Sequence, residues 1–206
     1  MPAPLSELIG AGRAAVLTME LQRGVVGDLS SFPELAAAVR DEGVLAGAAR
    51  VVEAARVAGV PVVHCTAGFR ADRRGSPANA PLIAALLRRP EHLLDGSPAV
   101  ELVPELGPEP GDLVSHRGHG VSPFTGTTLD PILRAHGVST VVATGVSLNL
   151  GIPGLAIEAV NLGYGVVVVR DAVTGVPADY ADALVRHTLR LVATMASADE
   201  VVAAFG

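Results

Sequence analysis

Short, continuously apolar segments alternate along the chain with longer segments in which apolar and polar residues recur with helical spacing. The short segments predict strands at residues 14–19, 60–65, 112–116, 139–144 and 166–170, with a further short strand near Thr194. Strands that are apolar at nearly every position are buried on both faces, which is typical of parallel sheets. We therefore expect a parallel sheet with both of its faces covered.

The amphipathic segments between these strands predict the helices that cover the sheet, at residues 44–58, 79–87, 127–136, 151–162 and 179–192. A last helix begins at Ser197, because Ser197 and Glu200 have the spacing of a capping box. The alternation of strands and helices predicts an α/β fold of three layers. It is a Rossmann-like arrangement, an about six-stranded and mostly parallel sheet with helices on both faces.

The composition narrows the class of protein. A length of 206 residues indicates a single domain over residues 1–206. Because 50% of the residues are hydrophobic and 17% are charged, the chain can bury a sizeable core and is not intrinsically disordered. The net charge of −6 argues against nucleic acid as a partner. No targeting signal is visible, and no apolar run reaches the roughly 20 residues of a membrane span, so we expect a cytoplasmic protein without a membrane partner.

The absence of Lys and the presence of a single Cys exclude several kinds of active site. All 15 basic residues are Arg, which excludes Schiff-base lysines, phosphate-binding P-loop lysines and Lys general acids. The single Cys65 excludes an intramolecular disulfide and a Cys-based zinc cluster. His64 precedes it, but neighbours on a strand point to opposite faces, so the two do not form a dyad. We expect Cys65 to be inert.

Polar residues that could carry chemistry follow the ends of the predicted strands. Glu20 comes directly after the first strand, where it is either a general acid or base or simply a polar strand terminus. Two histidines and an arginine lie after the third strand, where they could bind an anionic or carbonyl group: His116, Arg117 and His119. The two histidines supply too few ligands for a metal, so we expect no metal and no cofactor.

The fourth strand leads through a tight turn into a helix that begins near Gly151. Free N–H groups at a helix N-terminus can bind an anion or a substrate oxygen, whereas Ser147 or Asn149 could instead cap this helix. Since the carboxyl ends of parallel strands meet at one edge of a sheet, we expect this terminus to converge with Glu20 and with the basic residues of the third strand.

A polar, arginine-rich loop at residues 67–80 follows the second strand. Arg70 in this loop would suit a substrate carboxylate, but the loop could equally be an ordinary solvated one. The remaining histidines are interpreted as residues on helix surfaces: His92, His136 and His187.

Several short motifs follow one another in an order that resembles the isochorismatase-like, or cysteine hydrolase, superfamily. They are residues 20–22, 122–127, 144–151, 163–164 and 171–172, and the resemblance extends from Ala14 to about Ser197. It implies a cis peptide bond between Val146 and Ser147, and assembly as a homodimer or homotetramer. Together with the candidates named above, the resemblance leads us to expect that six residues bind the substrate: Gln22, Arg70, His116, Phe124, Ser147 and Asn149.

The chain departs from this superfamily at its usual triad of Asp, Lys and Cys. Glu20 stands at the Asp position and Gly151 at the Cys position, while the Lys position falls on Arg117 or Gly118. Covalent chemistry at a cysteine therefore does not carry over. A Gly at the Cys position resembles the true isochorismatases, which hydrolyse a vinyl ether, whereas the metal ligands of the nicotinamidase branch are missing from this sequence.

We therefore expect a hydrolase that cleaves a vinyl ether or related bond of a small molecule without a catalytic Cys. Glu20 is its expected acid or base, Arg117 or His119 replaces the Lys, and the terminus at Gly151 holds a substrate oxygen. One alternative is a degenerate member of the superfamily that binds a small molecule or a partner without turnover. The other is an unrelated α/β nucleotide-binding module.

Overall fold

A six-stranded sheet forms the centre of the computed structural model, which describes residues 4–10 and 12–206. The strand order is β3-β2-β1-β4-β5-β6, and every neighbouring pair is parallel. The strands are β1 Ala14–Met19, β2 Val62–Ala67, β3 Leu113–Arg117, β4 Thr140–Val146, β5 Gly165–Thr174 and β6 Thr194–Ala196. The expectation of about six mostly parallel strands is confirmed.

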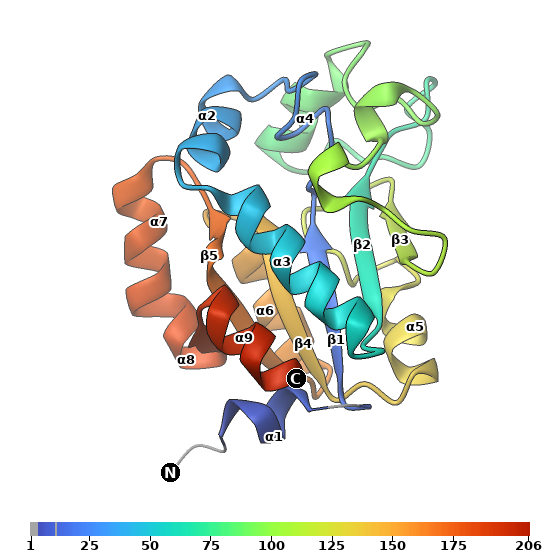
Figure 1. Ribbon diagram of the computed structural model, residues 1–206. Helices are drawn as coiled ribbons and strands as arrows, with labels where there is room; N and C mark the ends of the chain where they lie inside the picture. Colours follow the sequence, from blue (N-terminus) through green and yellow to red (C-terminus); the bar gives the residue numbers. More distant parts are fainter. Residues whose placement is uncertain (1–3, 11) are drawn as a thin grey trace.

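Helices cover both faces of this sheet, which gives the three predicted layers (Figure 1). One face packs against α1 Leu5–Ile9, α2 Pro33–Asp41, α3 Val44–Val57 and α9 Ala198–Phe205. The other face packs against α5 Leu129–Ala135, α6 Gly151–Asn161, α7 Ala178–Leu184 and the π-helical turn Val185–Leu189, which continues into α8 Arg190–Val192. The short α4 Pro81–Leu87 lies beyond the carboxyl edge of the sheet.

The central strand β1 shows why its sequence is apolar at nearly every position. Val16 belongs to the core on the α3 side, while Leu17 and Met19 belong to the core on the α6 side. Successive side chains of a strand point to opposite faces, so a strand between two helical layers needs apolar residues in both directions.

The largest difference between the predicted and observed elements is α2, which was not predicted. Pro33 and Glu34 in its first turn are typical of a helix start, but Phe32 before them has no side-chain group that could cap the helix. The capping box of Ser197 and Glu200 at the start of α9 is confirmed. Asp171 accepts a hydrogen bond of 2.7 Å from the amide of Ala198 and so also fixes the start of α9.

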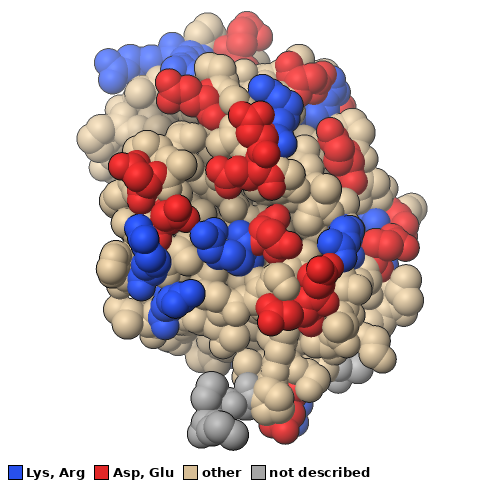
Figure 2. All heavy atoms as spheres, turned by 60° about the vertical axis from the view of Figure 1, so that its left-hand side comes forward, with Lys and Arg blue, Asp and Glu red and all other residues tan. Residues whose placement is uncertain are grey.

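Charged side chains are interspersed on the surface. On the face shown in Figure 2, acidic and basic groups of the described residues lie next to one another. Among residues 4–10 and 12–206, no helix has both the length and the apolar character that crossing a membrane requires.

The contact between β1 and β4 depends on Gly145, which lies opposite Met19 in the sheet. Its φ is 103°, and a Cβ at this position would overlap the carbonyl oxygen of Met19. We expect Gly145→Ala to lower the free energy of unfolding by about 3 kcal/mol, because strain at positive φ adds to the overlap. Urea denaturation followed by circular dichroism measures the change.

The matched control for this prediction is Gly163→Ala. Gly163 also has a positive φ, 93°, but a Cβ there meets nothing within 4 Å. The control should lose only about 1 kcal/mol, the cost of the backbone conformation alone. Equal losses in the two variants would show that the close approach of β1 and β4 does not matter for stability.

Candidate functional site

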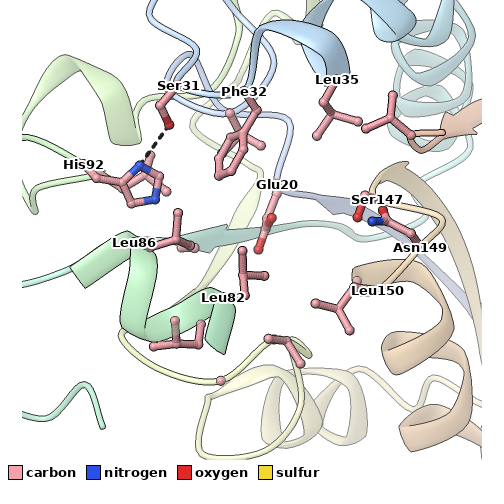
Figure 3. A pocket seen from close by; sticks show the side chains of 18 of the residues that line it. Glu20, Ser31, Phe32, Leu35, Leu82, Leu86, His92, Ser147, Asn149 and Leu150 are labelled. Atoms are coloured by element: carbon pink, nitrogen blue, oxygen red, sulfur yellow. Dashed lines mark hydrogen bonds between the residues drawn. The ribbon is translucent and has the colours of Figure 1, made fainter. Parts of the chain in front are cut away.

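A pocket opens where the chain direction along the sheet reverses. From β1 the chain continues outward through β2 and β3, and it then returns to the other side of β1 as β4. Open α/β sheets bind their ligands at the carboxyl ends of the strands beside such a point. The pocket there has a volume of about 420 Å³, and Glu20, Arg117, Ser147, Asn149 and Gly151 all line it. Figure 3 shows Glu20, Ser147 and Asn149 around it. The structure thus brings together residues from the ends of three strands.

Glu20 is held at the end of β1 by its own main chain. Its φ is 51°, in the left-handed region, and its amide donates a hydrogen bond of 2.9 Å to the carbonyl oxygen of Cys65 on β2. The carboxylate is 19% exposed and makes an ion pair with the guanidinium of Arg117. The close-up shows the carboxylate pointing into the pocket (Figure 3).

Arg117 ends β3 and is the cation of the site. Its side chain is 8% exposed, one terminal nitrogen contacts Glu20, and the other donates a hydrogen bond of 2.8 Å to the carbonyl oxygen of Gly120. Burial lowers the pKa of its guanidinium to about 10, which leaves it protonated at neutral pH. A fixed cation in contact with a carboxylate favours the ionised carboxylate.

Gly151 is the first residue of α6, and the main chain comes so close to it that a side chain has no room. A Cβ at this position would lie 2.9 Å from the carbonyl oxygen of Val146 and 3.2 Å from the terminal methyl carbon of Met19. A side chain at position 151 would therefore require a shift of the main chain.

The turn before α6 has the expected cis peptide bond between Val146 and Ser147. Neither Ser147 nor Asn149 caps the helix through its side chain; Leu150 is the N-cap residue, and the amide of Ile152 donates to the main-chain oxygen of Ser147. The interpretation of Ser147 or Asn149 as the capping residue is wrong, because the main chain of the turn, and not a side chain, accepts the hydrogen bond from the first turn of the helix. Both side chains are instead placed at the wall of the pocket.

Two residues of the expected substrate-binding set fill the interior of the protein. Gln22 is fully buried, and its amide group donates to the carbonyl oxygens of Ala67 and Val100 and accepts from the amide of Ala67. It therefore fixes the ends of β1 and β2 to each other. Phe124 stacks on Tyr164 with ring centroids 6.0 Å apart. Neither residue lines the pocket.

Three further candidates lie outside the pocket, and two of them pair with other polar groups. Arg70 is exposed and pairs with Asp72 in its own loop. His116 lies between Thr66 and Asp95, with its two ring nitrogens 3.0 and 3.2 Å from their oxygens. The ring of His119 covers Gly126 in the loop before α5. Of the two replacements considered for the Lys, only Arg117 contacts Glu20.

Sequence reasoning missed the far end of the pocket. His92 is 5% exposed, so its interpretation as a helix-surface residue is wrong. It lines the pocket together with Ser31, Phe32 and Phe69. These residues belong to loops without hydrophobic periodicity, and no pattern in the sequence indicates that they line a pocket.

Cys65 lies within β2 and is fully buried in the core on the α6 side. Burial raises the pKa of its thiol to about 12, so the reactive thiolate is scarce at neutral pH. We expect the folded protein not to react with an aromatic disulfide reagent, and the unfolded protein in guanidinium chloride to react with it fully. Rapid modification of the folded protein would contradict the expected inertness.

In the part of the chain that the structure describes, no group of three or more His, Cys, Asp or Glu side chains is arranged to hold a metal ion.

Comparisons with known proteins place these features in a family. The model of the isochorismatase domain matches residues 14–200. The ureidoacrylate amidohydrolase of Variovorax paradoxus is 35% identical over 144 residues, which are 64% of this chain and 56% of that protein. The enzyme of the same name from Methylobacterium radiotolerans is 37% identical over 142 residues, 63% and 54% of the two chains. The matched segments thus span about half the length of these curated relatives.

Solved structures share the fold over nearly their whole length. An isochorismatase family protein from Burkholderia thailandensis is 28% identical with a TM-score of 0.77, covering 94% of this chain and 96% of that one. The N-carbamoylsarcosine amidase from Thermoplasma acidophilum is 26% identical with a TM-score of 0.72, covering 91% and 97%. A cysteine hydrolase from Pseudomonas syringae has a TM-score of 0.80 at 22% identity and covers 100% and 98%.

Proposed function

Because the chain belongs to the isochorismatase family, we propose that it hydrolyses a small molecule bound in this pocket with water activated at Glu20, and without a covalent intermediate. The observation that carries the proposal is the ion pair of Glu20 with Arg117 at the pocket wall. A carboxylate beside a permanent cation, both facing the same cavity, stays ionised and so is in the form that can accept a proton from water, although the cation weakens it as a base.

The residues available at the pocket support a mechanism without a thiolate. The resemblance of residues 144–151 implies that Gly151 stands at the position of the nucleophile in amidase-type members, and Cys65 does not line the pocket. Covalent catalysis requires a nucleophilic side chain within reach of the substrate. Ser147 lines the pocket, but the structure gives it no neighbouring base.

The proposed reaction balances its protons through one carboxylate. Glu20 accepts a proton from water as the water oxygen attacks the carbonyl carbon of the substrate, and it then returns that proton to the leaving nitrogen or oxygen. Arg117 keeps its own proton, because a guanidinium is not deprotonated in proteins, so it cannot shuttle protons as a Lys can. Its role is to hold the carboxylate ionised and to attract developing negative charge.

The bond that is cleaved decides which form of Glu20 is active. The names of two relatives, ureidoacrylate amidohydrolase and N-carbamoylsarcosine amidase, point to C–N bonds, which suit the ionised carboxylate as a base. A vinyl ether must first be protonated, which needs the neutral acid. Activity that falls on acidification indicates the base, and activity that falls as the pH rises indicates the acid.

The test is a turnover screen of the purified protein against isochorismate, other vinyl ethers, small amides and carbamoyl compounds. We expect hydrolysis of at least one compound, with no mass added to the chain when the reaction is quenched at steady state. Hydroxylamine should not divert the product to a hydroxamate, because no acyl-enzyme is present to be intercepted. An acyl adduct on the chain would overturn the proposed mechanism.

A second function, binding without turnover, is favoured by the same ion pair. Glu20 and Arg117 compensate each other's charge, and the thiol and amine of the amidase relatives are both absent from this pocket. Saturable binding of a screened compound without turnover between roughly pH 5 and pH 9, where a carboxylate of ordinary pKa is ionised throughout, supports this alternative.

A further inference from the structure

The far end of the pocket is formed by His92 and Ser31. Nδ1 of the imidazole shares a hydrogen bond of 2.9 Å with the hydroxyl of Ser31. Nε2 is buried, and none of the described residues gives it a hydrogen-bond partner. Figure 3 shows this second nitrogen on the side of the ring that faces the pocket. Buried polar atoms without a partner are rare in proteins and call for an explanation.

Apolar side chains separate this end of the pocket from Glu20. Phe32 meets the imidazole edge to face, with ring centroids 5.6 Å apart, and Phe69 lies 5.9 Å from it at a tilt. Leu82 and Leu86 of α4 line the stretch between His92 and Glu20 (Figure 3). The pocket is therefore polar at both ends and apolar in the middle.

Hydrogen bonds from two arginines to main-chain carbonyl oxygens fix the loops that carry the imidazole. The guanidinium of Arg73 donates to the carbonyl oxygens of three residues around the ring, which are Arg89, Pro90 and His92 itself. Arg89 donates in turn to the carbonyl oxygen of Ser31. Neither arginine lines the pocket, so neither offers a charge to a ligand there.

The imidazole is uncharged at neutral pH. Burial, with Arg89 and Arg73 nearby, lowers the pKa of His92 to about 4. A neutral imidazole carries one proton, and the Ser31 hydroxyl can donate to Nδ1 or accept from it. Nε2 can therefore donate to a carbonyl or accept from a hydroxyl, depending on the tautomer.

We propose that Nε2 of His92 binds an uncharged polar group at the end of the substrate remote from the bond that is cleaved. The proposal rests on the proposed function, because it takes Glu20 and Arg117 as the reacting end. It defines the substrate class as a molecule with a carbonyl or related group at one end, an apolar and preferably aromatic body, and a hydroxyl or carbonyl at the other end.

The test compares matched ketones that cannot be hydrolysed, so it measures binding whether or not the protein is an enzyme. The probes are 4-phenylbutan-2-one and 4-(4-hydroxyphenyl)butan-2-one, together with the phenylacetone pair that is one carbon shorter. We expect the hydroxylated member of at least one pair to bind about tenfold more tightly by calorimetry, since it satisfies one buried hydrogen-bonding atom.

The variant His92→Phe should remove this preference, so that the two members of each pair bind with similar affinity. His136→Phe is the matched control, because His136 is exposed at the end of α5, and it should keep the preference of the native protein. In a second measurement, which needs no variant, nitrogen NMR of histidine-labelled protein should show one Nε2 signal that moves only with the hydroxylated ketone.

The proposal is overturned if neither pair shows a preference for the hydroxylated member, or if the preference survives in His92→Phe. It stands if the preference disappears in His92→Phe, even where no compound is turned over. Failure of the proposed hydrolysis is thus distinguishable from failure of this binding site.

Discussion

Glu20→Gln should lower kcat/KM by about 10²- to 10⁴-fold for any substrate that the protein turns over, because general acid–base catalysis contributes about this much. The amide keeps the shape of the side chain and can still accept a hydrogen bond from Arg117, but it cannot take or return a proton. Steady-state kinetics across a range of pH measure the loss, and the pH dependence assigned to Glu20 should disappear with it.

Glu34→Gln is the matched control, because Glu34 also lines the pocket but is exposed and has no contact with Arg117. It should change kcat/KM by less than about threefold, as expected for a carboxylate that moves no proton. The Tm of Glu20→Gln should stay close to that of the native protein. If Glu20→Gln turns over its substrate at the native rate, Glu20 is not the acid or base.

Arg117→Met should have the second large effect, on stability and on activity together. It leaves the Glu20 carboxylate, which is 19% exposed, without its counter-charge. We expect the free energy of unfolding to fall by about 2 kcal/mol, less than for a fully buried pair, because solvent still reaches the carboxylate. Urea denaturation at neutral pH measures this change.

The pH–rate profile separates a role in positioning charge from a purely structural role. In Arg117→Met the ionised carboxylate is no longer favoured, so the acidic limb of the profile should move to higher pH. Arg117→Lys restores the positive charge but not the second contact to Gly120, and its limb should stay closer to that of the native protein. The same displacement in both variants would contradict an electrostatic role for Arg117.

The fold could be predicted because its determinants are local or periodic. Strand β1 was predicted with its observed ends, since Ala14–Met19 must be apolar on both faces between two helical layers. The position of Glu20 at the pocket follows from the same reasoning, because parallel strands place their carboxyl ends at one edge. Arg117 and Gly151 follow in the same way.

The rest of the site depends on which way each side chain points. The position of a residue along a strand does not determine that direction. Gln22 and Phe124 stand close to the same edge, but their side chains turn into the interior, where a hydrogen-bond network and an aromatic partner hold them. His92 lies in the pocket because Arg73 organises its loop through main-chain carbonyls. Such contacts between loops produce no periodic pattern of hydrophobic residues and no characteristic motif spacing in the sequence.

The close approach of the Val146 carbonyl to Gly151 has a consequence for how this protein can change. Gly151→Cys alone would require a shift of the main chain, and the chain contains no Lys that could accompany the new thiol. Arg117→Lys alone would loosen the ion pair without supplying a thiol. A laboratory search for covalent catalysis in this pocket would therefore have to change both positions at once, because a substitution at Gly151 or at Arg117 alone supplies only one of the two groups.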